Sequence, residues 1–256
     1  MSQHEMRKSQ MMMISALGVL ALVTVMLVGV ARVAVSSMDS GTGNGAAQQA
    51  SHTDYSIASG KDLDIRGFDS IRFMGSWKVR LEQGDDWRVE LDYPRDMEKE
   101  LKVSVEDGRL VLDPGDWNTT VNWNWWKGGK NKGYRARIVM PALKSLEISG
   151  ATNMDLSGFT GKKLDIVISG AGNLEGDGGS YDNLSLTMSG AGNVDMRHMI
   201  FTDAQVNLSG AGNVRLGMNG GVLSGNLSGF GNIEYFGTVK DEHVNVSGFG
   251  KVHRSR

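Results

Sequence analysis

The segment Ser189-Gly190-Ala191-Gly192-Asn193 decides the fold, because close variants of it recur through the second half of the chain. The six copies read S-G-A-T-N, S-G-A-G-N (three times), S-G-F-G-N and S-G-F-G-K. They are spaced 20, 20, 20, 19 and 19 residues apart and begin at Ser149, Ser169, Ser189, Ser209, Ser228 and Ser247. A fixed period near 20 residues is typical of solenoids, in which each repeat forms one coil stacked on the last. The repeat therefore predicts a solenoid.

The residues around each Ser-Gly corner alternate between apolar and polar side chains, as in a strand with one buried face. The positions one and three before each serine are mostly apolar, and the position between them is mostly polar. A second strand follows the corner, with an inward column at Met154, Leu174, Val194, Val214, Ile233 and Val252. The spacing of two and the glycine density disfavour a helix. We therefore expect an all-β, single-domain parallel β-helix.

The last position of each corner forms a column of asparagines, namely Asn153, Asn173, Asn193, Asn213 and Asn232. Stacked turns lie roughly 4.8 Å apart, so equivalent side chains of neighbouring turns lie above one another. Amides in such a column can donate to and accept from the next turn, which predicts an internal ladder that holds the corner. The alternative is a ligand-binding stripe. The corner glycines suit a sharp bend, where a positive φ brings no Cβ strain.

Composition excludes several classes of protein. The 256-residue chain has a formal net charge of −2, which implies no basic surface for nucleic acid, and it has no cysteine. It therefore has no disulfide framework, thiol nucleophile, Cys-type zinc site or acylated lipoprotein anchor. The histidines show no metal-ligand spacing, and the sequence contains neither a calcium β-roll repeat nor G-x-S-x-G. We expect no cofactor, no metal and no catalytic residue.

The N-terminal region predicts a membrane anchor. The run from Ile14 to Ala31 carries no charge and matches the roughly 20 residues that cross a bilayer. Arg7 and Lys8 precede it, which places the N-terminus in the cytoplasm and the rest of the chain outside. We expect a single-pass protein of the cytoplasmic (inner) membrane with a periplasmic β-helix. The alternative is export after cleavage of a signal peptide near Ala34 to Ser36, but the apolar run is longer than a usual signal core.

These features divide the chain into three parts. Residues 1–35 form a cytoplasmic tip and transmembrane anchor (or uncleaved signal), and residues 36–60, rich in Gly, Ser, Ala, Gln and Thr, form a flexible linker. Residues 61–256 form the β-helix domain, with irregular opening coils and a cap over 61–145 and regular rungs of about 20 residues over 146–256. A cap is expected because an open end exposes apolar side chains and unpaired strand edges.

The opening strands and the serial corners together resemble a known family. The relevant stretches are F-D-S-I-R-F-M-G-S-W-K-V-R-L-E-Q-G-D from Phe68, E-D-G-R-L-V-L from Glu106, and the corners themselves. They resemble the bacterial head GIN domain family of auto-transporter adhesins over roughly Phe68 to Val252. The resemblance implies a right-handed parallel β-helix in the cell envelope and brings no catalytic residues. This chain differs in having Phe230 and Phe249 where earlier corners have alanine, and an anchor in place of an autotransporter barrel.

One segment is a candidate binding surface. Asp116 to Gly129 holds four of the six tryptophans, Trp117, Trp123, Trp125 and Trp126, among Asn, Thr and Lys. Tryptophan rings stack on sugars, and they also suit membrane interfaces and protein contacts. Four rings are hard to bury together in a connection so rich in Asn and Gly, so we expect some of them to form a ligand or partner surface. The alternative is that the rings plug the open end of the solenoid.

The outward column after the corner begins with three carboxylates, Asp155, Glu175 and Asp195. Such a column is a candidate for cation binding, or for a carboxyl pKa raised by like-charge repulsion. The favoured interpretation is a row of solvated side chains that keeps the sheet soluble.

We therefore expect a non-catalytic cell-envelope binding or scaffold module that contacts a glycan or another envelope protein. The alternative is a polysaccharide-acting enzyme on a β-helix scaffold, for which the fold alone is weak support. A close carboxylate pair with Lys or Arg in a long groove would favour the enzyme, and a smooth face would favour binding.

Overall fold

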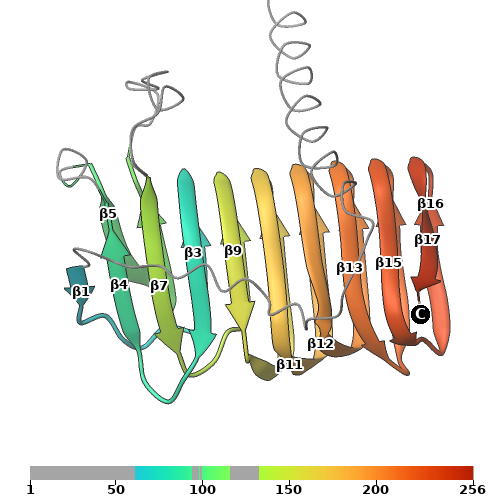
Figure 1. The fold of residues 1–256 in the computed structure, drawn as a ribbon, viewed down its shortest axis with the longest axis horizontal. Helices are drawn as coiled ribbons and strands as arrows, with labels where there is room; N and C mark the ends of the chain where they lie inside the picture. Colours follow the sequence, from blue (N-terminus) through green and yellow to red (C-terminus); the bar gives the residue numbers. More distant parts are fainter. Residues whose placement is uncertain (1–60, 94–97, 99, 116–132, 256) are drawn as a thin grey trace, which may run out of the picture. The chain divides into compact units, whose positions relative to one another are not determined.

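The structure, a computed structural model, describes residues 61–93, 98, 100–115 and 133–255. Their regular structure is all β-strand, in one sheet of 17 strands that coils into a solenoid (Figure 1). Within these ranges, no helix has the length and hydrophobicity needed to span a membrane. The segment Ile14 to Ala31, on which the anchor prediction rests, lies outside them. The residues Ser56–Arg256 form a compact unit by themselves.

The strands that the structure describes are β1 (Lys61–Leu63), β2 (Ser70–Phe73), β3 (Ser76–Gln83), β4 (Arg88–Asp92), β5 (Lys102–Glu106), β6 (Arg109–Asp113), β7 (Tyr134–Met140), β8 (Ser145–Ile148), β9 (Ala151–Ser157), β10 (Thr160–Ile168), β11 (Ala171–Met188), β12 (Ala191–Leu208), β13 (Ala211–Asn219), β14 (Val222–Leu227), β15 (Phe230–Thr238), β16 (Asp241–Val246) and β17 (Phe249–Ser255).

Parallel pairing joins successive turns into two ladders. One ladder runs β7–β3–β9–β11–β12–β13–β15–β17. The other runs β6–β2–β8–β10–β11–β12–β14–β16, since the long strands β11 and β12 belong to both. The Ser-Gly corners stack along one edge, here called the corner edge, at residues 149–153, 169–173, 189–193, 209–213, 228–232 and 247–251. The predicted all-β solenoid is confirmed, and its right-handed sense stays a prediction.

Apolar side chains fill the space between the ladders. The column before the corner serine contributes side chains at most 4% exposed, namely Ile148, Ile168, Met188, Leu208 and Leu227. The second-strand column is at most 2% exposed at Met154, Leu174, Val194, Val214 and Ile233. Both predicted inward columns are therefore confirmed up to the last turn. The return segments add the buried rings of Phe159, Tyr181 and Phe201, for which the repeat gave no signal.

The corner glycines lie against the backbone of the preceding turn. A Cβ at Gly190 would lie 1.6 Å from the carbonyl oxygen of Gly170, and one at Gly192 would lie 1.7 Å from that of Gly172. Gly192 also has a φ of 150°, a backbone conformation in which a residue with a side chain would be strained. The sharp bend, which the sequence predicts, explains only part of the need for glycine at these positions. The close approach of stacked backbones is a second reason for glycine at the corners, and at Gly190 it is the main reason.

Antiparallel strands close the N-terminal end of the solenoid. Strand β4 pairs antiparallel with β7, β1 with β4, and β5 with β6. The β5–β6 hairpin turns at Asp107 and Gly108, with φ of 50° and 73°, where the sequence predicts a turn. The turn made of β2 and β3 lies between β6–β7 and β8–β9, so spatial order differs from chain order. These antiparallel partners cover an edge that would otherwise be open.

The last described turn, β16 and β17, is less buried than the others. Val246 ends an inward column but is 41% exposed. Glu242 and Arg254 occupy inward columns that hold Leu223 and Tyr235 one turn earlier. Charged side chains at inward positions disfavour further strand pairing, so this edge is protected against aggregation.

Candidate functional site

The four tryptophans of the predicted binding surface, Trp117, Trp123, Trp125 and Trp126, lie outside the described residues. The described residues that flank their segment, Gly115 and Gly133, follow β6 and precede β7. These two strands pair with β2 and β3, which adjoin the Met74–Gly75 corner. A Cβ at Gly75 would meet the Pro114 side chain at 2.2 Å, which places the end of β6 beside this corner. Both described ends of the tryptophan-rich segment therefore lie at the corner edge.

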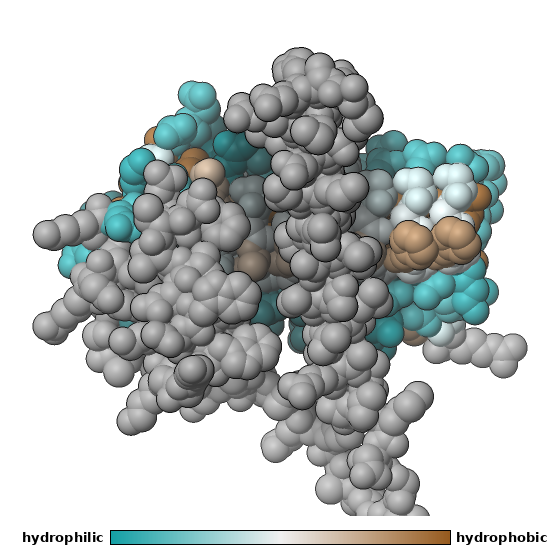
Figure 2. Space-filling view, turned by 90° about the horizontal axis from the view of Figure 1, so that it is seen from above, coloured by the Kyte–Doolittle hydropathy of each residue, from teal (hydrophilic) through white to brown (hydrophobic). Residues whose placement is uncertain are grey.

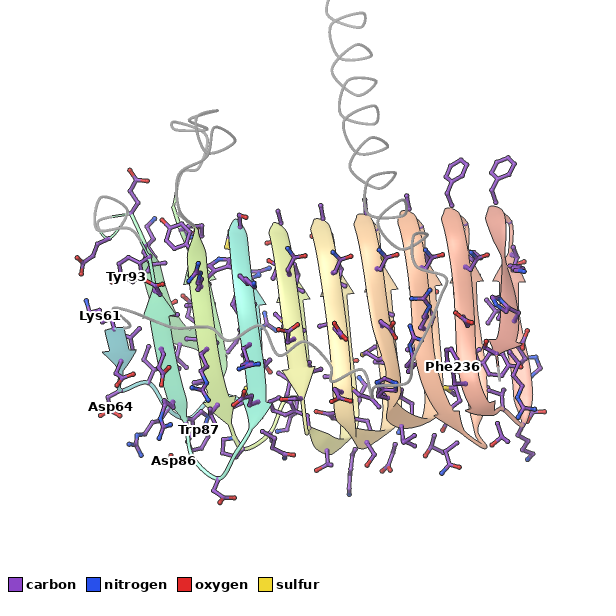
Figure 3. All side chains as sticks on the ribbon, viewed as in Figure 1. Lys61, Asp64, Asp86, Trp87, Tyr93 and Phe236 are labelled. Atoms are coloured by element: carbon purple, nitrogen blue, oxygen red, sulfur yellow. The ribbon has the colours of Figure 1, made fainter. Side chains whose placement is uncertain are left out.

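The two tryptophans that the structure describes serve the fold. Trp77 is buried, and its indole Nε1 donates to the carbonyl oxygen of Met74 at 2.6 Å. Trp87, labelled in Figure 3 near the N-terminal end of the solenoid, donates from Nε1 to the Phe68 carbonyl oxygen at 2.8 Å and packs on the Phe68 ring. Each indole N–H thus has a partner, as buried tryptophan requires.

The asparagine column forms a continuous run of hydrogen bonds. The Nδ2 atom of Asn173 donates to Oδ1 of Asn153 at 3.1 Å. The Oδ1 atom of Asn173 in turn accepts from the backbone N and the Nδ2 of Asn193, at 3.3 and 3.2 Å. The same double contact links Asn213 to Asn193 and Asn232 to Asn213. Each bridging amide oxygen thereby holds both the backbone and the side chain of the next turn.

The expected position of this column is wrong in one respect. The asparagines were expected inside the solenoid, yet Asn153, Asn173 and Asn193 are exposed, and Asn213 and Asn232 are half-buried. Their neighbours at the next position point inward, so strand alternation turns the amides outward. The amides form a surface row whose hydrogen-bonding groups mostly satisfy one another.

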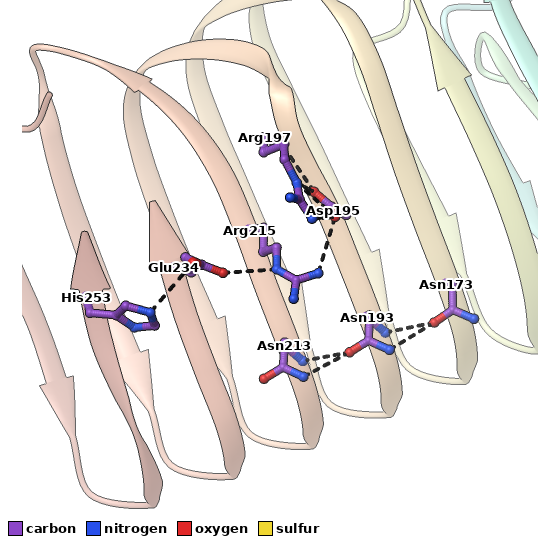
Figure 4. A network of polar contacts seen from close by, with 8 residues as sticks. All are labelled: Asn173, Asn193, Asp195, Arg197, Asn213, Arg215, Glu234 and His253. Atoms are coloured by element: carbon purple, nitrogen blue, oxygen red, sulfur yellow. Dashed lines mark hydrogen bonds and ion pairs between the residues drawn. The ribbon is translucent and has the colours of Figure 1, made fainter. Parts of the chain in front are cut away.

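The charged column beside the asparagines is also paired internally (Figure 4). Arg215 donates from Nε to Glu234 at 3.0 Å and from Nη1 to Asp195 at 3.4 Å. Arg197 donates from Nε to Asp195 at 2.9 Å, and the His253 imidazole lies 3.7 Å from Glu234. Alternating charges therefore link three successive turns across the outer face, at Asp195, Arg215 and Glu234, and His253 contacts this row from the next turn.

The surroundings of two carboxylates in this row, Asp195 and Glu234, lower their pKa values. Burial raises the pKa of Asp195, but hydrogen bonds from Arg197 and the positive charges of Arg197 and Arg215 outweigh it, so the pKa lies below its ordinary value. A hydrogen bond from Ser255 and the Arg215 guanidinium likewise hold the pKa of Glu234 low against a smaller effect of burial. At Asp195 this lowering of the pKa is opposite to the rise in pKa that three stacked carboxylates alone would cause. The arrangement suits a salt-bridged surface better than proton transfer.

No metal centre is evident in the part of the chain that the structure describes. In those residues no group of three or more His, Cys, Asp or Glu side chains is placed to hold a metal ion. The carboxylates Asp155, Glu175 and Asp195 are neighbours in register. Asp195 is engaged by two arginines, which compete with any cation for its oxygens.

The corner edge carries one feature that the sequence signalled only as a departure from the repeat. Phe230 and Phe249 replace the alanines of earlier corners, and they are 63% and 76% exposed. Their rings stack with centroids 5.1 Å apart and planes 9° apart. Figure 2 shows a hydrophobic patch at the C-terminal end of the solenoid. Large aromatic side chains in the preceding turns, such as Phe201, are buried.

The chain belongs to the family described as "Putative auto-transporter adhesin, head GIN domain", which matches residues 67–238. It is similar to the crystal structure of a putative adhesin from Bacteroides fragilis, with 19% identity and a TM-score of 0.61 over 77% of this chain and 96% of that one. Two proteins from Parabacteroides distasonis are also similar. A putative lipid binding protein shows 19% identity and a TM-score of 0.41, over 76% of this chain and 96% of that one. A putative adhesin shows 16% and 0.47 over the same shares. No curated protein matches this chain.

The family predicted from the serial corners is thus confirmed. At these identities the solved structures establish the fold alone. The description of the family as an adhesin head is in line with a module that binds without catalysis.

Proposed function

We propose that this protein is a non-catalytic envelope module, anchored in the inner membrane by residues 1–35, with its solenoid in the periplasm. Its tryptophan-rich segment, Asp116 to Gly129, contacts a glycan or another envelope protein. The solenoid serves as the rigid scaffold that presents this segment.

The observation that carries the proposal is the internal pairing of the outer polar rows. Along the described strands, asparagine amides bond to asparagine amides and arginines bond to carboxylates. These rows stabilise the stack and leave few polar groups free for a ligand. We therefore expect the ligand to bind where the repeat is interrupted. The longest interruption of a corner is the segment between β6 and β7. Its four tryptophans are the residue type that dominates contact surfaces.

The polysaccharide-acting alternative requires a carboxyl group with a raised pKa as general acid. Asp195 and Glu234, the best-defined carboxylates of the outer face, have lowered pKa values instead. These two carboxylates are therefore poorly suited to act as the general acid of a polysaccharide-cleaving enzyme.

A glycan array and an envelope-protein capture with residues 51–256 test the proposal, since this range contains the compact unit Ser56–Arg256. The wild type should bind, and the double variant W125A/W126A should lose binding while its unfolding midpoint stays close to that of the wild type. Thr187→Ala, an exposed change four turns along the same ladder from β6, is the matched control and should bind normally. If W125A/W126A instead loses several kcal/mol of stability, the segment is an end plug, and the proposed binding surface is withdrawn.

A further inference from the structure

The corner edge ends in two aromatic side chains that the fold does not need. Alanine occupies their column at Ala151, Ala171, Ala191 and Ala211, and the turns stack equally well there. Phe230 and Phe249 follow in the same column and are exposed. Exposure of two stacked apolar rings is unfavourable in water, so these rings mark a contact.

The corner residues around the two rings carry no negative charge, and the next acid along β15, Glu234, is paired with Arg215. The six corners contain only Ser, Gly, Ala, Thr, Phe and Asn, together with Lys251 in the last one. Val246, 41% exposed, directly precedes that last corner. The carboxylates of the final turn, Asp241 and Glu242, lie at the opposite end of β16. Apolar rings and a lysine on one edge, with no acid among the corner residues, suit the headgroup region of an anionic lipid surface.

The size of the pair distinguishes between possible occupants. A phenylalanine buries roughly 150–250 Å² at most, so the two rings offer less than about 500 Å². A stable protein interface needs about 800 Å² from each partner, which argues against a second copy or another protein at this place. Charged Glu242 and Arg254 in the inward columns of the same turn also oppose docking of another sheet end. A small apolar contact is sufficient where another tether already holds the domain near its partner.

The proposed anchor supplies such a tether, and the inference rests on that part of the proposed function. Residues 36–60 separate the apolar run from β1. A flexible chain of this length has a root-mean-square reach of about 28 Å, at 5–6 Å times the square root of its residue number. The solenoid would then remain within reach of the bilayer, at an effective concentration on the order of millimolar.

We propose that the C-terminal part of the corner edge docks on the surface of a phospholipid bilayer. Phe230 and Phe249 insert among the lipid headgroups, and Lys251 contacts lipid phosphates. This contact fixes which edge of the solenoid faces the membrane.

The test uses a single introduced cysteine, because the chain has none of its own. Residues 51–256 are held on vesicles of phosphatidylethanolamine, phosphatidylglycerol and a nickel-chelating lipid through an N-terminal histidine tag. The tag replaces the anchor, so the result does not depend on whether residues 1–35 span a membrane. An environment-sensitive fluorophore is attached at Ser247→Cys, on the corner edge, or at Lys240→Cys, at the opposite end of β16.

We expect the probe at position 247 to shift to shorter wavelength and to be quenched by spin-labelled lipid, and the probe at position 240 to be unaffected. Adding Phe230→Ala and Phe249→Ala should reduce quenching at position 247 to the level seen at position 240. These alanines match the earlier corners, and circular dichroism should show an unchanged fold. The control pair Val167→Ala and Ile200→Ala removes two other exposed apolar side chains, both 43% exposed, and should leave quenching intact.

Three results would overturn the proposal. The first is absence of quenching at position 247, and the second is equal quenching with and without the two phenylalanines. The third is self-association in solution that depends on Phe230 and Phe249, measured by sedimentation without vesicles, which would show that a second copy covers the rings.

Discussion

Replacing the first glycine of a middle corner gives the sharpest test of the stacked backbone. In Gly190→Ala, the new Cβ would lie 1.6 Å from the carbonyl oxygen of Gly170, whereas Cβ contacts below 3.0 Å are essentially never seen. The two turns must therefore separate by at least 1.4 Å, the difference between these distances. A shift of this size stretches two hydrogen bonds between these turns, from Ala191 N to the Gly170 oxygen (3.0 Å now) and from Ser189 N to the Ile168 oxygen (2.9 Å now).

The expected cost follows from these contacts. Two lost backbone hydrogen bonds cost about 0.5–1.5 kcal/mol each, and a leftover buried donor or acceptor costs more. Disturbed packing of the two turns adds to this, so we expect a loss of roughly 3 kcal/mol or more. Gly190 itself does not have a positive φ, so the whole effect comes from the clash.

Gly178→Ala is the matched control in a return segment. Gly178 has a φ of 68°, but its nearest atom to a new Cβ is 4.0 Å away. Alanine there should cost only the left-handed backbone penalty of about 1–2 kcal/mol. The assay is urea unfolding of residues 51–256 followed by circular dichroism. An equal or smaller loss for Gly190→Ala would show that the corners do not depend on close backbone approach.

Three further predictions follow from the outer rows and the N-terminal segment. Asn193→Ala removes the oxygen that accepts from both nitrogens of Asn213, so it should cost about 1–2 kcal/mol; Thr187→Ala should cost about 0.5 kcal/mol or less. Equal midpoints for the two variants would refute a stabilising ladder. The lowered pKa of Asp195 contributes stability above the unfolded-state pKa, and this is lost as pH falls through the lower folded value. Asp195→Asn should therefore lose less stability than the wild type on acidification below about pH 4, and parallel curves would contradict this. The full chain should stay in the membrane fraction with its first residues intact; a mature protein that starts near Ser37 would identify a cleaved signal peptide.

The repeated half of the fold could be predicted because its determinants are local. The 20-residue period and the alternation around residues such as Ile168 and Leu174 specify turn length and inward face within each repeat. The opening half could not be predicted in the same way. Two of its features depend on pairing between residues that are distant in sequence. One is the insertion of β2 and β3 between β6–β7 and β8–β9, and the other is the antiparallel cap.

The outer rows show a similar division. Asn193 was expected inside, although the inward Val194 beside it already implies an outward side chain in an alternating strand. The sequence shows only that charges alternate in the column of Asp195, Arg215 and Glu234. The contacts of Arg215 with both carboxylates could not be predicted, because side-chain pairing depends on the register of the turns. The aromatic pair Phe230 and Phe249 was signalled by a break in the alanine column, but only the structure shows that both rings are exposed.

Isolated envelope polysaccharide distinguishes a solenoid that binds without turnover from one that cleaves its ligand. Residues 51–256 are incubated with the polysaccharide at high protein concentration, and both the bound fraction and the chain length of the polymer are measured over time. We expect saturable retention that W125A/W126A abolishes, with the chain length of the polymer unchanged. Progressive shortening of the polymer by the wild type, lost in a carboxylate variant such as Asp195→Asn, would contradict it.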